Sequence, residues 1–231
     1  MNICVFKRYE LKYLLTLTQY YNVLKEAKDN LIMDRHGEST IQSLYYDTDD
    51  FRLIRRSLEK PEYKEKLRLR SYGLANENDT IFMELKRKCS GVVYKRRIEI
   101  SSNAIKDNDL GNNQISKEIV YFMNFYKNLR PKMLLLYDRI AYFGEGDLRI
   151  TFDRNIRYRT DRLSLSAGLD GTPIFDNEKI LMEIKTGTSI PLWLVQILSK
   201  EQITKTSFSK YGEAYKIQKS SINIKEENKV G

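Results

Sequence analysis

The chain has few of the residues on which metal centres and disulfide frameworks depend. Its 231 residues include two cysteines, Cys4 and Cys89, and one histidine, His36. These residues have no metal-site spacing, and two cysteines do not make a disulfide scaffold in a chain of this size. His36 lies in a turn-like segment, so neither a Ser-His-Asp nor a Cys-His arrangement is available. We therefore expect a protein of the reducing cytoplasm without a thiol or imidazole nucleophile.

Long hydrophobic runs are also missing. No stretch approaches 18 apolar residues, and no charged segment followed by an apolar one opens the chain, so we expect neither a membrane span nor secretion. Lys and Arg number 40 against 31 Asp and Glu, a net charge of +9 that favours an anionic partner: nucleic acid, membrane phosphate or a phosphorylated small molecule. Composition does not choose among these partners.

Charged and apolar residues alternate in the segment that surrounds Leu67 and Leu69. In a strand, these two leucines point to one face, and Lys66, Arg68 and Arg70 point to the other. A single strand of this kind is usually a solvated edge. The same alternation recurs in six other segments, which favours one shared charged surface over seven exposed edges.

The remaining pattern predicts strands separated by helices. Strands are expected over residues 3–13, 41–46, 64–70, 80–88, 92–100, 133–143, 148–153 and 180–185, and helices over 18–30, 51–58, 192–199, 209–219 and from Ser116 towards Pro131. His36-Gly37 is expected to be a turn, and Asp47 or Asp49 to cap the helix that follows. Because there is no repeat or interior linker, we expect one domain over 1–220 and a disordered charged tail over 221–231.

The polar positions of these strands hold mostly Arg, Lys or Glu and few Thr, Ser or Gln residues. An open sheet with a basic outer surface is the ordinary interpretation. The helices, however, need an apolar surface to cover. If the sheet closes into a barrel, its apolar face lies outward under the helices and its charged face lines a tunnel.

The predicted lining has twelve cations and five acids. The cations are Arg8, Lys12, Lys66, Arg68, Arg70, Lys86, Lys88, Lys95, Arg97, Arg139, Arg149 and Lys185, and the acids are Glu10, Glu84, Glu99, Asp153 and Glu183. Buried uncompensated charge is costly, so such a cavity must hold anions, and facing arginines suit several linked phosphates. An acid in this set is more often an ion-pair partner than a metal ligand, although phosphates handled with Mg²⁺ or Mn²⁺ need one or two carboxylate oxygens.

Eight short motifs carry a family resemblance. They are Arg8-Tyr9-Glu10-Leu11-Lys12, Tyr45-Tyr46-Asp47-Thr48, Lys66-Leu67-Arg68-Leu69-Arg70, Glu84-Leu85-Lys86, Tyr94-Lys95-Arg96-Arg97, Tyr137-Asp138-Arg139, Glu183-Ile184-Lys185 and Ser209-Lys210-Tyr211. Their order resembles the VTC domain, the polyphosphate polymerase module of the vacuolar transporter chaperone complex and of bacterial stand-alone proteins. That family belongs to the triphosphate tunnel metalloenzymes, and the likeness spans residues 6–215.

The resemblance implies an α+β fold, a closed eight-stranded antiparallel tunnel with a charged interior and outer helices. It also implies metal-dependent transfer of the γ-phosphoryl group of ATP to a growing polyphosphate chain, with Mn²⁺ or Mg²⁺, ATP and polyphosphate or pyrophosphate as partners and no nucleic acid. By motif, the catalytic cations are Arg68, Arg70, Arg139, Arg149 and Lys86, the substrate-binding residues are Lys12, Lys66, Lys95, Arg97, Tyr137, Ser209 and Lys210, and the metal ligand is Glu183.

Two other functions remain open. A triphosphatase of the same architecture needs a carboxylate to activate water, and Glu10 or Glu84 is a candidate, although Arg8 stands where hydrolytic relatives commonly carry Glu. A non-catalytic anion-binding module is the second alternative, because Ser207 stands where the family often has a second Lys. Lys205 is a neighbouring candidate to replace that cation.

Overall fold

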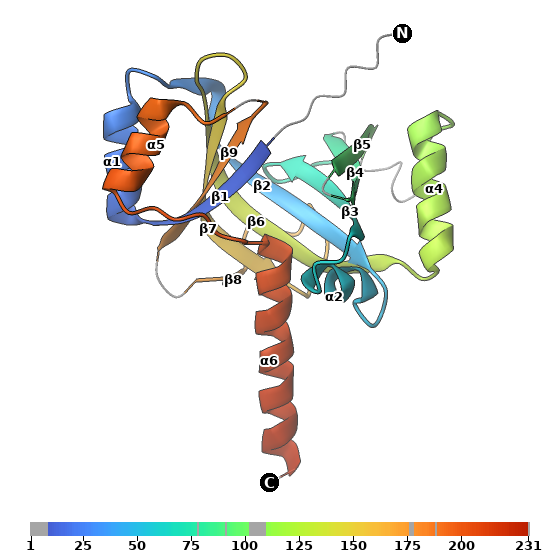
Figure 1. The fold of residues 1–231 in the computed structure, drawn as a ribbon. Coiled ribbons are helices and arrows are strands. Elements are labelled where there is room, and N and C mark those ends of the chain that lie inside the picture. The colour runs from blue at the N-terminus through green and yellow to red at the C-terminus, as the bar shows by residue number, and fades with distance from the viewer. Residues whose placement is uncertain are drawn as a thin grey trace. The chain divides into compact units, whose positions relative to one another are not determined.

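The computed structural model describes residues 9–77, 79–90, 92–101, 110–175, 178–187 and 189–230 (Figure 1). Cys4, Arg8 and residues 102–109 lie outside these residues. The chain forms two compact units. The first comprises Met1–Thr40, Tyr137–Ile156 and Phe175–Phe208, and the second comprises Ile41–Leu136, Arg157–Ile174 and Ser209–Gly231.

The described strands form one nine-stranded sheet. They are β1 (Tyr9–Thr16), β2 (Ile32–Asp47), β3 (Tyr63–Tyr72), β4 (Thr80–Cys89), β5 (Val92–Ser101), β6 (Arg130–Phe143), β7 (Arg149–Arg159), β8 (Thr172–Pro173) and β9 (Lys179–Thr186). Their order is β1-β9-β7-β6-β2-β3-β4-β5, with β8 paired to β7. The order ends at β1 and β5 and the described residues show no pairing of these two, so the closed eight-stranded tunnel stays a prediction. The mainly antiparallel α+β architecture is confirmed.

In the first unit, β1 and β9 pair in a register that sets acids opposite cations. Glu10 lies opposite Lys185, and Lys12 lies opposite Glu183. The apolar side of these strands joins a buried cluster that includes Phe152. Helices α1 (Leu17–Ala27) and α5 (Leu192–Lys200) pack against each other (Figure 1). The alternation therefore divides the strands into a charged face and a core face, as predicted.

In the second unit, β3 and β4 bury their leucines on one face. Leu67, Leu69 and Leu85 are almost fully buried in one cluster with side chains of α2 (Arg52–Leu58) and α4 (Gln114–Tyr126). The cations of β3 lie on the opposite face. Burial of such side chains stabilises the fold by about 1.5–3 kcal/mol each, so a one-residue change of strand register is strongly disfavoured.

Asp47, at the end of β2, caps α2 as predicted. Its carboxylate accepts hydrogen bonds from the backbone N–H groups of Leu53 and Ile54, at 2.8 and 3.0 Å. The same carboxylate accepts a bond of 2.9 Å from the hydroxyl of Tyr211, at the start of α6 (Lys210–Val230). Helices α2 and α6 accordingly pack together (Figure 1).

Two predictions about local structure need correction. The His36-Gly37 turn is wrong, because both residues lie inside β2; Gly37 has φ +57°, which glycine adopts without strain. The last helix is longer than the predicted 209–219, since α6 continues to Val230 through most of the expected charged tail. That tail contains Ile, Lys and Glu, which include good helix formers, so local propensity accounts for the extension.

Candidate functional site

The second unit places four cations around one buried carboxylate, Glu84 on β4. Arg68 Nη2 lies 2.7 Å from Glu84 Oε2, and Lys95 Nζ lies 2.7 Å from Oε1. Arg97 and Arg70 approach the same carboxylate at 3.3 and 4.0 Å. We call these five residues the Glu84 cluster. The register of β3, β4 and β5 produces it, because Glu84 pairs with Arg68 on one side and with Arg97 on the other.

The electrostatics of the Glu84 cluster favour additional negative charge. Burial by itself raises the pKa of Glu84, but Arg68, Arg70 and Lys95 outweigh burial and lower the pKa to about 2. One ionised carboxylate cannot neutralise four cations. Lys95 and Arg97 are also partly exposed, with 46% and 35% of their side chains accessible, so an anion from solution can reach them.

A second group of phosphate-binding candidates lies beside the Glu84 cluster in the same unit. Lys66 Nζ lies 3.4 Å from Ser209 Oγ and 5.9 Å from the centre of the Tyr211 ring. Lys86 on β4 is exposed and pairs in register with Lys66 on β3 and Lys95 on β5. Lys210 follows Ser209 at the start of α6. The structure thus brings Lys66, Lys86 and Ser209 to the charged face of this unit.

The first unit contains a second charged cluster, whose centre is Glu183 on β9. Lys12 Nζ lies 3.4 Å from Glu183 Oε1, 3.6 Å from Glu10 and 3.2 Å from the carbonyl oxygen of Phe208. Arg139 Nη2 lies 3.5 Å from Glu183 Oε2. We call Glu10, Lys12, Arg139, Asp153 and Glu183 the Glu183 cluster.

Arg139 is held rigidly in this cluster. Its Nε and Nη2 donate to the two oxygens of the fully buried Asp153, at 2.5 and 2.7 Å. Burial opposes the charged form, but Asp153, Tyr137 and Glu183 raise the pKa of Arg139 well above its ordinary value. The guanidinium also lies 5.2 Å from the ring centre of the buried Tyr137. Arg139 therefore stays charged with a fixed orientation.

Arg149 belongs to the first unit but not to the Glu183 cluster. Its Nη2 lies 3.6 Å from Asp34, and its guanidinium lies 5.3 Å from the Phe143 ring centre. Its Nε is buried and has no acceptor among the described residues. A buried donor of this kind is costly without a partner, and a phosphate oxygen would satisfy it.

The Glu183 carboxylate fits a metal ion only in part. No group of three or more His, Cys, Asp and Glu in the described part of the chain could hold a metal by itself. Both oxygens of Glu183 face cations at 3.4 and 3.5 Å, longer than good hydrogen bonds. Mg²⁺ or Mn²⁺ would compete with Lys12 and Arg139 for these oxygens, and Glu183 would supply only one or two of the oxygen ligands that such an ion takes.

Sequence reasoning did not assign a role to Tyr45 and Tyr211 in the second unit. Tyr45 accepts a hydrogen bond of 2.9 Å from Arg68 Nη1 and stacks on Tyr211, with ring centres 4.4 Å apart. Tyr211 in turn donates to Asp47. The register of β2 puts Tyr45 opposite Arg68 and Tyr46 opposite Leu67. Alternation within β2 was the available signal, but the segment 41–46 is so rich in apolar residues that it hides this period.

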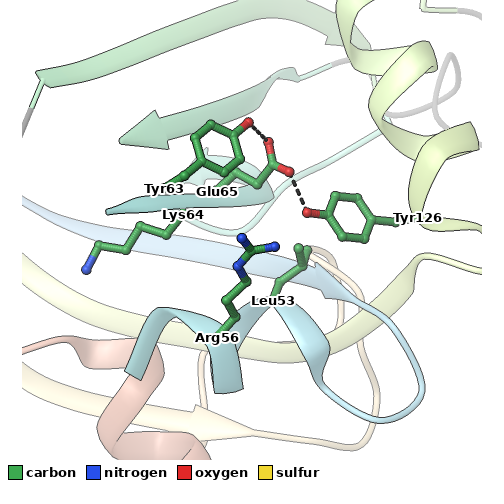
Figure 2. A pocket seen from close by; sticks show the side chains of 6 residues that line it. All are labelled: Leu53, Arg56, Tyr63, Lys64, Glu65 and Tyr126. Carbon is green, nitrogen blue, oxygen red and sulfur yellow. Dashed lines mark hydrogen bonds between the residues drawn. The ribbon is translucent and has the colours of Figure 1, made fainter. Parts of the chain in front are cut away.

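A buried carboxylate on the core side of β3 was also missed. Figure 2 shows Glu65 between Tyr63 and Tyr126, whose hydroxyls donate to it at 2.6 and 2.5 Å. Arg87 approaches the same carboxylate at 3.3 Å and also pairs with Glu118 on α4. The neighbouring cavity has room for little more than a water molecule. This network attaches α4 to the sheet and offers no substrate site.

Ser207 stands where the family often has a second Lys. Ser207 and Lys205 are both exposed, and Lys205 forms a backbone bridge with Tyr13 in the first unit. Replacement of the missing cation by Lys205 stays a prediction. Separately, none of the helices among the described residues is both long and apolar enough to span a membrane.

The fold is shared with solved structures of low sequence identity. A putative adenylyl cyclase from Hippeastrum with a dominant triphosphatase activity aligns over 89% of this chain and 93% of its own, with 15% identity and a TM-score of 0.56. A putative adenylate cyclase from Vibrio parahaemolyticus aligns over 90% and 97%, with 13% identity and a TM-score of 0.50. No curated protein matches the chain. The VTC domain matches residues 7–219, nearly the whole chain and every cluster described above, so the protein belongs to the VTC domain family.

Proposed function

We propose that this protein is a polyphosphate polymerase that transfers the γ-phosphoryl group of ATP to a growing inorganic polyphosphate chain. The Glu84 cluster carries the proposal, because four cations around one buried carboxylate have charge left for phosphate oxygens. Membership of the VTC family supports the same substrate class. The match also covers segments of both units, which supports a single domain over 1–220.

Phosphoryl transfer needs positioning and charge neutralisation more than covalent help from the protein. The nucleophile in this proposal is a terminal oxygen of the acceptor phosphate, which is already anionic and needs no general base. Arg68 and Arg70 stabilise negative charge on bound phosphate, and Lys66, Lys86, Lys95, Arg97, Ser209 and Lys210 hold the neighbouring phosphates of the chain.

The Glu183 cluster has a different part in the proposal. Glu183 would hold Mn²⁺ or Mg²⁺, and the ion would supply further neutralisation of phosphate oxygens. Lys12 and Arg139, which contact Glu183, bind phosphate oxygens of the substrate, with Tyr137 as a hydrogen-bonding partner. Arg149 offers its unsatisfied buried Nε.

A triphosphatase is the second candidate, favoured by the fold shared with the Hippeastrum protein. Hydrolysis needs a carboxylate that can accept a proton from water. Glu84 is unsuited to this role, because its pKa is about 2 and four cations surround it. Glu10 is the better candidate, since its side chain is 34% exposed, whereas that of Glu84 is almost fully buried.

One incubation separates these functions. Purified protein is mixed with ATP, Mn²⁺ or Mg²⁺ and a pyrophosphate primer, and the products are resolved on a gel. We expect chains longer than the primer. Free phosphate alone would show a triphosphatase, and tight polyphosphate binding without turnover would show a non-catalytic module.

A further inference from the structure

Two stacked tyrosines lie beneath the cations of the second unit. The rings of Tyr45 and Tyr211 are 4.4 Å apart with an interplanar angle of 20°. Both side chains are buried, with 9% and 2% exposure. The stack is fixed at both ends, because Tyr211 donates to Asp47 and Tyr45 accepts from Arg68. The Tyr45 hydroxyl therefore has a defined position.

The proton of the Tyr45 hydroxyl has no acceptor among the residues that the structure describes. A guanidinium has only donors, so the bond from Arg68 Nη1 occupies a lone pair of the phenolic oxygen and leaves its O–H free to donate. The Tyr211 hydroxyl differs, since Asp47 Oδ2 accepts its proton at 2.9 Å. The protein thus accepts the proton of the Tyr211 hydroxyl, whereas the Tyr45 hydroxyl can still donate a hydrogen bond.

Cations surround the free donor. Lys66, Arg68 and Arg70 from β3 and Tyr211 from α6 are the charged and titratable groups that face Tyr45. Burial raises the pKa of the Tyr45 phenol, but Arg68, Lys66 and Arg70 outweigh burial and lower it to about 8. A more acidic O–H is a stronger hydrogen-bond donor, and the oxygens that the three cations would attract are those of an anion.

The adjacent Tyr46 provides a contrast within the same strand. It points to the other face of β2, is 9% exposed and belongs to the hydrophobic cluster with Leu67. Burial alone raises the pKa of its phenol to about 12. Tyr45→Phe and Tyr46→Phe each remove one hydroxyl from the same strand. Tyr46→Phe is therefore a matched control for Tyr45→Phe.

We propose that the Tyr45 hydroxyl is a phosphate ligand of this site, which donates its proton to a phosphate oxygen bound between Arg68 and Lys66. Tyr211 and Asp47 are positioning residues in this arrangement, because they hold the Tyr45 ring and do not touch the phosphate. The inference rests on the proposed function and specifies one way in which that function recognises its substrate.

The test is the binding of inorganic tripolyphosphate, measured by calorimetry on the full chain. Loss of a hydrogen bond to a charged acceptor predicts that Tyr45→Phe weakens binding about tenfold at neutral pH. Tyr46→Phe is expected to bind within about twofold of wild type. The wild-type affinity should also fall as pH rises through about 8, because the phenolate cannot donate and repels the anion. Tyr45→Phe should lack this step. Thermal unfolding of each variant verifies the fold.

The outcomes separate this inference from the proposed function. Equal affinities of wild type and Tyr45→Phe, with the same pH profile, would overturn the role of Tyr45 and leave polymerisation untouched. Weaker binding by Tyr45→Phe without any ATP-dependent chain extension by wild type would support Tyr45 and reject the polymerase. A wild-type protein that does not bind tripolyphosphate would overturn both.

Discussion

The two units differ in the charged groups that surround a buried glutamate. Around Glu84, four cations share one carboxylate, and the surplus is positive. Around Glu183, Lys12 and Arg139 contact three carboxylates, those of Glu183, Asp153 and Glu10, and Lys185 lies opposite Glu10 in the strand register, so positive and negative charges nearly balance. A cationic surplus suits a bare anion, whereas a cluster rich in carboxylates suits an anion that arrives with a metal ion.

The net charge of the predicted lining therefore does not show how positive and negative charges are distributed within it. The predicted lining is basic as a whole, yet the acids gather beside Lys12 and Arg139. Arg139 is also less available than its motif implies, because Asp153 takes two of its donors. We therefore propose that the Glu84 cluster binds phosphate directly and that the Glu183 cluster binds it together with a metal ion.

The largest effect is expected when the Glu84 cluster loses a guanidinium. Arg68→Ala removes a cation that contacts both Glu84 and Tyr45, and we expect polymerase turnover to fall about 1000-fold. The measurement is the initial rate of polyphosphate synthesis from ATP. Arg96→Ala is the control, because Arg96 is on β5 but pairs with Glu118 on the core side. Loss of less than about threefold for Arg68→Ala would refute the assignment.

A smaller effect is expected for the metal-binding carboxylate. Glu183→Gln should lower metal-dependent turnover about 100-fold and raise the Mn²⁺ concentration that gives half-maximal rate, because an amide is a poor ligand for a hard cation. Glu84→Gln serves as the comparison. It should alter turnover but leave that Mn²⁺ concentration unchanged. An unaltered metal dependence in Glu183→Gln would remove the distinction between the clusters.

The smallest effect concerns stability and pH. The cations of its cluster lower the pKa of Glu84 from 4.5 to about 2 in the folded chain, so its contribution is complete above pH 4.5 and is lost as pH falls through about 2. Solvent screens the exposed Lys95 and Arg97, and we expect Glu84→Gln to cost about 2 kcal/mol of unfolding free energy at pH 7. Urea unfolding should show this cost shrinking towards pH 2. A constant cost over that range would contradict the ion-pair explanation.

Much of this could be predicted from the sequence because β-strand alternation depends on a strict period of two. Leu67 and Leu69 enter the core, and Arg68 and Arg70 gather at Glu84, as that period requires. The grouping of acids could not be predicted, because it depends on which strands become neighbours. Glu10 and Glu183 are far apart in sequence, and only the pairing of β1 with β9 brings both to Lys12.

The sequence predicted least well those residues whose burial or secondary structure differs from what their local sequence pattern indicates. Glu65 lies on the same face of β3 as Leu67 and Leu69 and is buried with them, which is costly unless hydrogen-bond donors satisfy its carboxylate. Tyr63 lies close in sequence, but Tyr126 comes from α4, so tertiary packing decides whether the carboxylate is tolerated. His36 and Gly37 show the reverse case, since pairing within β2 overrides a local turn signal.

The carboxylate of Asp47 has a consequence for the order of folding. Its bonds to Leu53 and Ile54 span a few residues, whereas its bond to Tyr211 closes a separation of 164 residues. Loop-closure entropy therefore lets α2 form on its cap well before the start of α6 docks. Ser209 reaches Lys66 only with that docking. We expect a nascent chain to reach its full affinity for phosphate only after α6 has been synthesised and has docked.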